Sequence, residues 1–275
     1  MLEIPESTTI GIQAQSILTG KIIKEVVNAT SPHRFTWYNG DPEKYSELLV
    51  GKHIISAEGH GAFVDLHCND GIHITISDGV NMKYYPAIES HPKKHQLLIV
   101  FDDDSFLAFT VSMYGSIYAF KGQLDNPYYI GSYQKKSPLN EDFDEDYFNS
   151  LFKSVGKDIS IKALLATEQR IPGLGNGVLQ DILFNAQIHP KRKISTISKL
   201  QKSDLFHSLK TTIRNMTDRG GRDTEKDFYG NAGGYKTILS KNTYKKPCPI
   251  CGDNIVKEAY LGGTVYYCPT CQKIK

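Results

Sequence analysis

The sequence lacks the features that mark membrane-spanning, secreted and strongly charged proteins. It holds no run of about 20 apolar residues, the length that a membrane-spanning helix requires. The first residues, Met1 to Glu6, have neither the basic stretch nor the apolar core of a signal peptide. The formal net charge is only +2, so any affinity for nucleic acid must come from how the charge is distributed. We therefore expect a cytoplasmic protein with no membrane partner.

Cysteine is scarce, but its placement is informative. Four of the five cysteines close the chain as two C-x2-C pairs with sixteen residues between them: Cys248, Cys251, Cys268 and Cys271. This spacing places four thiolates around one ion and is typical of a tetrahedral structural zinc site. The alternative is that these cysteines form disulfides or remain free thiols. Thiols that bind zinc suit a reducing compartment. The fifth cysteine, Cys68, is interpreted as a small buried hydrophobic residue of a strand.

The remaining residues predict a globular protein of two domains followed by the cysteine-rich finger. The chain has 275 residues, of which 40% are hydrophobic, enough for more than one core. Apolar residues at helical spacing predict a helix over 5–18. Short alternating segments separated by Gly, Asp and Asn over 21–131 predict an antiparallel sandwich or barrel. Residues 125–140 are typical of a linker, helices are expected to about residue 216, and the five glycines of 218–234 indicate a mobile loop.

A glycine-rich break in the helical region is the second strong feature. Ile171-Pro172-Gly173-Leu174-Gly175 interrupts an apolar helix pattern, and Asn176 stands at the expected N-cap of the next helix. Glycines before a helix start let the backbone approach an anion, and the free N–H groups there bind phosphate. We expect Gly175 and Asn176 to hold a phosphate group. The alternative is an ordinary helix–turn–helix corner with glycine caps.

These two regions together carry a resemblance to a known family. Residues Lys162 to Arg192, through Gln169, the Ile171–Asn176 segment and Ile188-His189-Pro190, resemble the helix–two-turn–helix of the formamidopyrimidine-DNA glycosylase and endonuclease VIII family. Residues Cys248 to Lys273 resemble the zinc finger of that family, and the order of parts matches along the whole chain.

The resemblance implies an α+β fold. Its parts are an N-terminal helix plus an antiparallel β-sandwich, then a helical helix–two-turn–helix domain with a C-terminal β-hairpin zinc finger. The implied boundaries are 1–131 for the helix and sandwich, 132–140 for a linker, 141–239 for the DNA-binding helical domain and 240–275 for the finger. It further implies one zinc ion, double-stranded DNA with a damaged base as the partner, and a monomer.

The implied activity is removal of damaged bases in base excision repair. Family members flip a damaged base out of DNA, cleave its glycosidic bond and then nick the strand, the usual members with an N-terminal proline as nucleophile. Here Leu2 stands at that position, Met1 is expected to be retained, and Ala62 aligns with the strand lysine of the family. The resemblance thus implies a DNA glycosylase with weak or absent AP-lyase nicking. Two alternatives are a catalytically inactive binder of damaged DNA on the same scaffold and a zinc-ribbon protein with a protein partner.

Individual site residues follow from the same resemblance. Glu3 matches the catalytic glutamate and Glu6 continues its motif, although both carboxylates could serve only to complement the helix dipole. The residues implied to bind DNA phosphates or fill the gap left by the flipped base are His73, Asn176, Gly175, Lys236, Ile76, Met113 and Tyr114. In the finger, Gly262-Gly263 occupies the place of the arginine that enters the minor groove in relatives.

Overall fold

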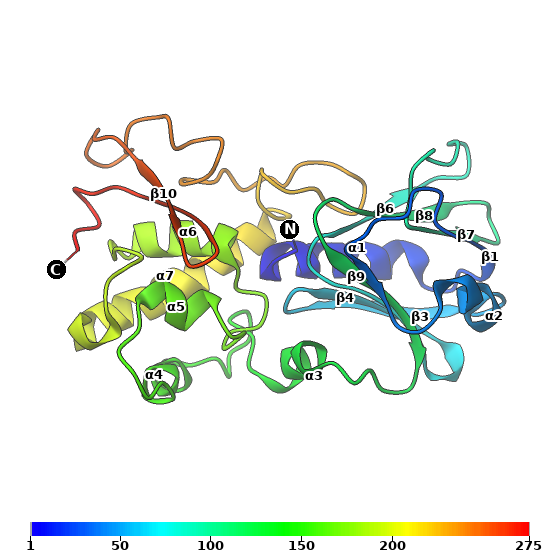
Figure 1. Ribbon diagram of the computed structural model, residues 1–275, viewed down its shortest axis with the longest axis horizontal. Helices are drawn as coiled ribbons and strands as arrows, with labels where there is room; N and C mark the ends of the chain where they lie inside the picture. Colours follow the sequence, from blue (N-terminus) through cyan, green and yellow to red (C-terminus); the bar gives the residue numbers. More distant parts are fainter. Residues whose placement is uncertain (1, 275) are drawn as a thin grey trace.

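The computed structural model describes residues 2–274, and its parts lie along one elongated axis (Figure 1). Helix α1 (Ile4–Leu18) runs from the middle of the molecule into the half that contains the β-sheets. Pro5 suits its first turn, and the Glu6 carboxylate accepts from the backbone N–H of Glu3 at 3.3 Å, one arm of a capping box. The predicted helix over 5–18 is confirmed and begins one residue earlier. The expectation about Met1 lies outside the described residues.

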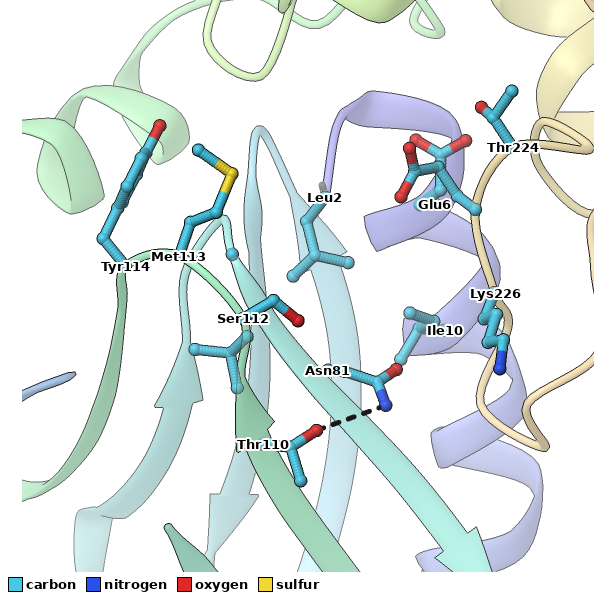
Figure 2. Close-up of a pocket in the computed structure, with 13 residues that line it drawn as sticks. Leu2, Glu6, Ile10, Asn81, Thr110, Ser112, Met113, Tyr114, Thr224 and Lys226 are labelled. Atoms are coloured by element: carbon cyan, nitrogen blue, oxygen red, sulfur yellow. Dashed lines mark hydrogen bonds between the residues drawn. The ribbon is translucent and has the colours of Figure 1, made fainter. Parts of the chain in front are cut away.

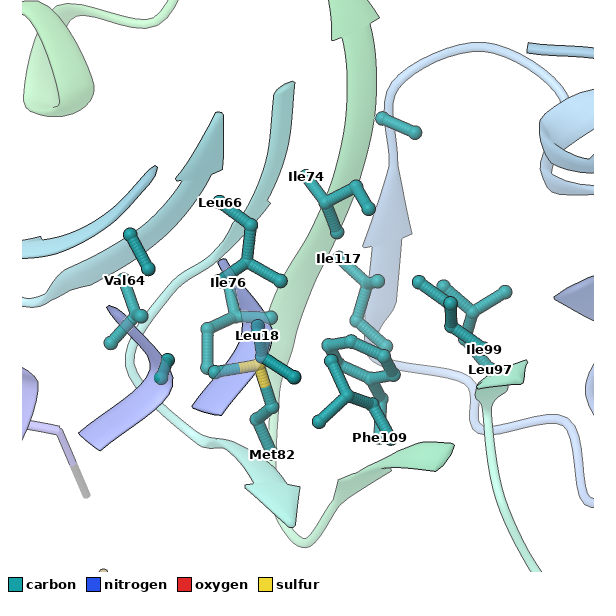
Figure 3. Close-up of a cluster of buried hydrophobic side chains, with 14 of the residues drawn as sticks. Leu18, Val64, Leu66, Ile74, Ile76, Met82, Leu97, Ile99, Phe109 and Ile117 are labelled. Carbon is teal, nitrogen blue, oxygen red and sulfur yellow. The ribbon is translucent and has the colours of Figure 1, made fainter. Parts of the chain in front are cut away.

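Two sheets form the half of the molecule around α1. Within residues 2–274 their strand orders are β1-β7-β8-β6 and β2-β9-β5-β4-β3, with β2–β9 as the one parallel pair. The strands are β1 (Ile23–Val27), β2 (Thr36–Tyr38), β3 (Ile54–His60), β4 (Phe63–Cys68), β5 (Ile72–Ile76), β6 (Val80–Tyr85), β7 (Leu97–Phe101), β8 (Phe106–Val111) and β9 (Gly115–Lys121). Residues of both sheets face each other in a shared apolar core, to which α1 adds Leu18 (Figure 3). The short helix α2 (Tyr45–Leu49) packs at one end. The predicted antiparallel sandwich is confirmed.

The other half is helical and has a core of its own. Its helices are α4 (Glu145–Lys153), α5 (Ile161–Ala166), α6 (Asn176–Asn185) and α7 (Lys199–Asp218), followed by the finger hairpin β10 (Val256–Tyr260) and β11 (Gly263–Tyr267). The preceding helix α3 (Pro127–Gln134) packs instead against the five-stranded sheet, where Tyr129 contacts Phe63 and Phe120. Helix α3 forms inside the segment predicted as a linker, because the Asn126 side chain accepts from the backbone N–H groups of Tyr128 and Tyr129 and Pro127 opens the first turn. Among the described residues, no helix is long and apolar enough to cross a membrane.

Helix α1 belongs to both halves. Ile4 at its start packs in the helical core, whereas Ile10, Ala14 and Leu18 pack in the sandwich core. Its contact with β3 is unusually close: a Cβ atom on Gly59 would lie 1.9 Å from the carbonyl oxygen of Ser7. Because Gly59 has no side chain, β3 can approach the backbone of α1 this closely. This contact sets the position of the first residues of α1, which meet the helical half.

Candidate active site

The side chain of Glu3 connects the two halves at the start of α6. Its Oε1 accepts from the N–H of Gly177 at 2.9 Å, and its Oε2 accepts from the N–H of Val178 at 2.8 Å. Glu3 is buried, and a Cβ atom on Gly175 would lie 2.6 Å from its carboxyl carbon. The glycine therefore makes room for the carboxylate, whose charge complements the positive end of the helix.

The structure corrects the expected N-cap of α6. The N-cap residue is Gly175, and Asn176 is the first residue of α6. The N–H groups of Gly177 and Val178 in the first turn of α6 donate to an internal carboxylate, that of Glu3, and the roles of Gly175 and Asn176 in phosphate binding stay predictions. The side-chain amide of Asn176 donates to the carbonyl oxygen of Thr264 in the finger. Sequence spacing could not reveal this, because the competing anion lies more than 170 positions away along the chain.

Arg222 is the cation of this site. Its Nη1 lies 3.3 Å from Glu3 Oε1, and its Nη2 and Nε lie 2.8 and 2.9 Å from the two carboxylate oxygens of Glu6. All three side chains are buried. A Cβ atom on Gly177 would lie 1.6 Å from Nη1, so the guanidinium occupies space that only glycine leaves free. We call Glu3, Glu6 and Arg222 the buried charge cluster.

Burial and charge oppose each other within the buried charge cluster. Burial raises the pKa of Glu3, Arg222 acts to lower it, and Glu6 raises it further. Burial acts to lower the pKa of Arg222, but the carboxylates of Glu3 and Glu6 outweigh it and raise that pKa above its usual value. The sequence analysis missed Arg222 because its segment was interpreted as a mobile loop. In the structure Arg222 and Phe228 of that segment are buried.

A cavity of about 360 Å³ lies beside the buried charge cluster, between the sandwich and the segment after α7. Figure 2 shows Leu2 between Met113 and Glu6 at this cavity. The side chain of Leu2 is buried and contributes to the sandwich core. The other lining residues are Ile10, Gly79, Val80, Asn81, Thr110, Ser112, Tyr114, Thr224, Glu225 and Lys226. The site therefore combines an apolar floor with two buried carboxylates nearby.

Asp78 is a second residue that the sequence analysis missed. It precedes Gly79 of the cavity wall, in the turn between β5 and β6. Its Oδ1 atom is buried and has no hydrogen-bond partner among residues 2–274. Burial raises the pKa of Asp78 to about 6, and the charge of Glu3 contributes in the same direction. A carboxyl group that titrates near neutral pH can exchange a proton with a substrate or with water.

The three residues predicted to fill the gap in DNA fall into two environments. Met113 is 64% exposed and Tyr114 is 42% exposed, both at the cavity rim between β8 and β9. Ile76 is only 1% exposed and packs in the sandwich core. The expectation for Ile76 is wrong, because it shares the period-2 alternation of Ile72 and Ile74 and therefore faces inward.

Two of the predicted phosphate contacts, His73 and Lys236, lie in different parts of the structure. His73 lies on the outer face of the five-stranded sheet, stacked on Phe120, with its Nδ1 3.4 Å from Asp65 Oδ2. The side chain of Lys236 is 80% exposed, and its Nζ lies 4.0 Å from a carboxylate oxygen of Asp223. Their roles in DNA binding stay predictions.

The four finger cysteines converge as their spacing predicts. The Sγ atoms of Cys248 and Cys271 lie 3.8 Å apart, those of Cys251 and Cys268 lie 3.4 Å apart, and all four lie within 4.8 Å of one another. A tetrahedral zinc ion with bonds of about 2.3 Å to sulfur needs sulfur–sulfur edges of about 3.8 Å. The donor set and its spacing therefore fit a single zinc ion.

The finger hairpin rests on the helical half through polar contacts. Lys162 donates from its Nζ to the carbonyl oxygen of Tyr260, and Gln180 donates to that of Thr264 at 3.0 Å. Buried Gln272 links the finger to the segment after α6. Its side chain accepts from the N–H of Cys268 and donates to the carbonyl oxygen of Ile188, both at 3.0 Å. These contacts place the hairpin directly over the start of α6.

Comparison with known proteins finds similar chains of matching length. A model described as the formamidopyrimidine-DNA glycosylase H2TH domain matches residues 135–227. A formamidopyrimidine-DNA glycosylase of Bacillus cereus is 26% identical over 281 residues, which cover 99% of this chain and 99% of that protein. One from Lactobacillus delbrueckii subsp. bulgaricus is 28% identical over 291 residues, with 99% and 100% coverage. The chain is thus similar to formamidopyrimidine-DNA glycosylases over almost its whole length, and residues 135–227 match the H2TH domain of these proteins.

Solved structures agree with this family's fold. The MutM (Fpg) protein from Thermus thermophilus superposes with a TM-score of 0.81 at 21% identity, covering 99% of both chains. A Lactococcus lactis Fpg in complex with DNA containing an abasic site gives a TM-score of 0.84 at 21% identity, covering 98% of this chain and 99% of that chain. The formamidopyrimidine-DNA glycosylase fold thus extends over essentially the whole described chain.

The buried charge cluster predicts a large effect of removing its cation. Arg222→Met leaves two buried carboxylates without their partner, and we expect the free energy of unfolding to fall by about 3–5 kcal/mol. Without the charge of Arg222, burial raises the pKa of Glu3 further. The loss in free energy of unfolding should therefore be largest at neutral pH, where Glu3 must be ionised, and should become smaller as pH falls through that raised pKa. Urea unfolding at several pH values measures both effects.

Arg219→Met is the matched control, because Arg219 is an exposed arginine three positions away. It should change the free energy of unfolding by no more than about 0.5 kcal/mol. A small, pH-independent loss for Arg222→Met would contradict the structural importance of the buried charge cluster.

Proposed function

We propose that this chain is a DNA glycosylase of base excision repair that binds damaged duplex DNA and hydrolyses the bond between a damaged base and its sugar. The observation that carries the proposal is the cavity beside Glu3 and Glu6, with Met113 and Tyr114 exposed at its rim. Enzymes that act on a base inside a duplex must take it out of the stack into such a pocket. Exposed apolar side chains at the rim can occupy the space that the base leaves.

The partner is inferred from relatives with the same architecture. Curated relatives of full length are named formamidopyrimidine-DNA glycosylases. Solved relatives include Lactococcus lactis Fpg with DNA that contains an abasic site and with DNA that contains N7-benzyl-Fapy-dG. We infer that this chain also takes damaged double-stranded DNA, with the four finger cysteines holding a structural zinc ion.

The buried carboxylates supply a chemical route for base removal. Positive charge develops on the sugar as a glycosidic bond breaks, and a carboxylate fixed nearby stabilises it. We assign this role to Glu3, whose oxygens are fixed by the N–H groups of Gly177 and Val178. We assign activation of the attacking water to Asp78, which directly precedes Gly79 of the cavity wall and whose Oδ1 atom is unpaired among residues 2–274. Its pKa, raised to about 6, suits this role.

Two other positions, Leu2 and Ala62, argue against efficient strand nicking. Nicking in this family uses an N-terminal proline amine as a nucleophile, and Leu2 stands in its place with its side chain buried in the sandwich core. The strand lysine of the family is replaced by Ala62. We therefore propose a glycosylase that works by hydrolysis, with weak or absent AP-lyase activity.

A second function is favoured by the engagement of Glu3. Both of its oxygens accept backbone hydrogen bonds, and Oε1 also faces Arg222. A carboxylate so fully bound can be purely structural, in which case the chain is a catalytically inactive binder of damaged DNA. This alternative differs from the first in one measurable outcome, the release of a base.

Base release on a panel of oxidised, alkylated and cross-linked duplexes distinguishes the two functions. We expect strand breaks that become visible only after alkali, because hydrolysis leaves an intact abasic strand. Glu3→Gln should lower the single-turnover rate of base release about 100-fold or more, the effect typical of losing a group that stabilises the charge of the transition state. Glu47→Gln, which changes an exposed glutamate of α2, is the matched control and should leave the rate unchanged.

Three results would count against the proposal. Tight binding with no base release on any duplex would favour the inactive binder. Equal rates for the native chain and Glu3→Gln would remove Glu3 from the chemistry. A strong covalent adduct after borohydride reduction on lesion DNA would contradict the expectation of weak nicking, because it requires an amine nucleophile.

The role of Asp78 predicts a pH dependence. The pKa of about 6 is above the usual aspartate value, so Asp78 is protonated in acid and becomes a base as pH rises. We expect the single-turnover rate of base release to rise through pH 6 and then level off. Asp78→Asn should lower the rate and remove this rise, and an unchanged profile would contradict the assignment.

A further inference from the structure

A group of histidine and aspartate side chains lies on the outer face of the five-stranded sheet, apart from the cavity. Asp65 and His67 belong to β4, and His73 is the registered cross-strand partner of His67 on β5. Each offers one ligand atom, and these three atoms all lie within 4.8 Å of one another. We call Asp65, His67 and His73 the outer-face triad. No step proposed above for base removal uses it, although His73 is also a predicted contact to a DNA phosphate.

The spacing within the outer-face triad matches ligands of a metal ion better than it matches a hydrogen bond. His73 Nδ1 lies 3.4 Å from Asp65 Oδ2, beyond the usual N–H···O range of about 2.7–3.2 Å. In the part of the chain that the structure describes, this Nδ1 atom is buried and has no hydrogen-bond partner. Bonds of about 2.1 Å from zinc to nitrogen and oxygen give ligand–ligand edges of about 3.4 Å in a tetrahedron.

The residues around the triad already orient its ligands. His67 Nε2 lies 3.1 Å from Glu58 Oε1, which leaves the other ring nitrogen of His67 for the centre of the triad. Asp65 accepts from Thr75 Oγ1 at 2.8 Å and from the hydroxyl groups of Tyr129 and Tyr133. Metal-binding histidines and carboxylates characteristically have such outer partners, which fix the ring and carboxylate orientation.

Charge gives an independent reason for a cation here. Asp65 is fully buried. Over residues 2–274, no lysine or arginine forms an ion pair with it, and the nitrogen within 4.0 Å of its carboxylate belongs to a histidine, His73. An ionised carboxylate inside a protein is costly unless it is paired or coordinates a metal. A divalent ion at the centre of the triad would supply the missing charge.

We propose that Asp65, His67 and His73 bind one divalent zinc-class transition-metal ion, separate from the ion of the four cysteines. Two histidines and one carboxylate form the three-ligand set of metal sites that keep a further position open. The side chains of His67 and His73 are 27% and 19% exposed, so the triad lies just below the surface of the sheet and the open position is left for a ligand from outside the triad. A water molecule or an anionic oxygen can occupy it.

Metal titration of the intact chain tests the proposal. Protein loaded with one zinc ion per chain, as measured by mass spectrometry of the metal, is titrated with Zn²⁺ in a calorimeter. We expect one further equivalent to bind, which raises the total from one to two ions per chain. Co²⁺ used in place of the added zinc should give weak d–d bands without new thiolate charge-transfer absorption, because the triad has no sulfur ligand.

Paired histidine variants show where the added ion binds. His67→Gln with His73→Gln should abolish the second binding event and leave the first ion and the circular dichroism spectrum unchanged. His53→Gln with His207→Gln, which changes two exposed histidines, should retain both ions. The proposal is overturned if the native chain takes up no second equivalent, or if the His67 and His73 variant still binds it. Either outcome leaves the glycosylase proposal untouched, because no step of that proposal uses this ion.

Discussion

The ion pairs between buried Arg222 and the carboxylates of Glu3 and Glu6 are the constraint on which the rest of the structure depends. Glu3 and Glu6 belong to the start of α1, which packs in both cores, and Glu3 also binds the first N–H groups of α6. Removing three charged groups from water is costly unless all of them are paired. Their mutual pairing therefore fixes the sandwich, the helical half and the segment after α7 relative to one another, and it places the cavity between them.

Features set by local sequence could be predicted. The finger follows from four cysteines at two fixed spacings, and the start of α1 follows from Pro5 and Glu6. The inward face of β5 could also have been predicted, since Ile72, Ile74 and Ile76 alternate with polar residues. The family alignment instead assigned Ile76 to the DNA surface, and the burial of this side chain shows that the period-2 pattern was the better guide.

Features set by contacts between distant segments could not be predicted. Arg222 looked like part of a mobile loop, because the space left by Gly177 and the charge of Glu6 become visible only after the segments pack. The hydrogen bond from the Asn176 amide to the finger carbonyl of Thr264 joins segments that lie far apart along the chain. Asp78 carried no signal at all, since its raised pKa comes from burial in the folded chain. In each case the missing information was the packing of distant segments, which spacing along the chain does not contain.

The central claim is that this scaffold recognises damaged duplex DNA, whether or not it cleaves it. Fluorescence anisotropy with a duplex containing one abasic-site analogue, and with the same duplex undamaged, measures this directly at several salt concentrations. The account predicts tighter binding to the abasic duplex and an affinity that falls steeply with salt, because phosphate contacts release counterions. Equal affinity for both duplexes, or binding that is absent or insensitive to salt, would contradict the account and favour a protein partner for the finger.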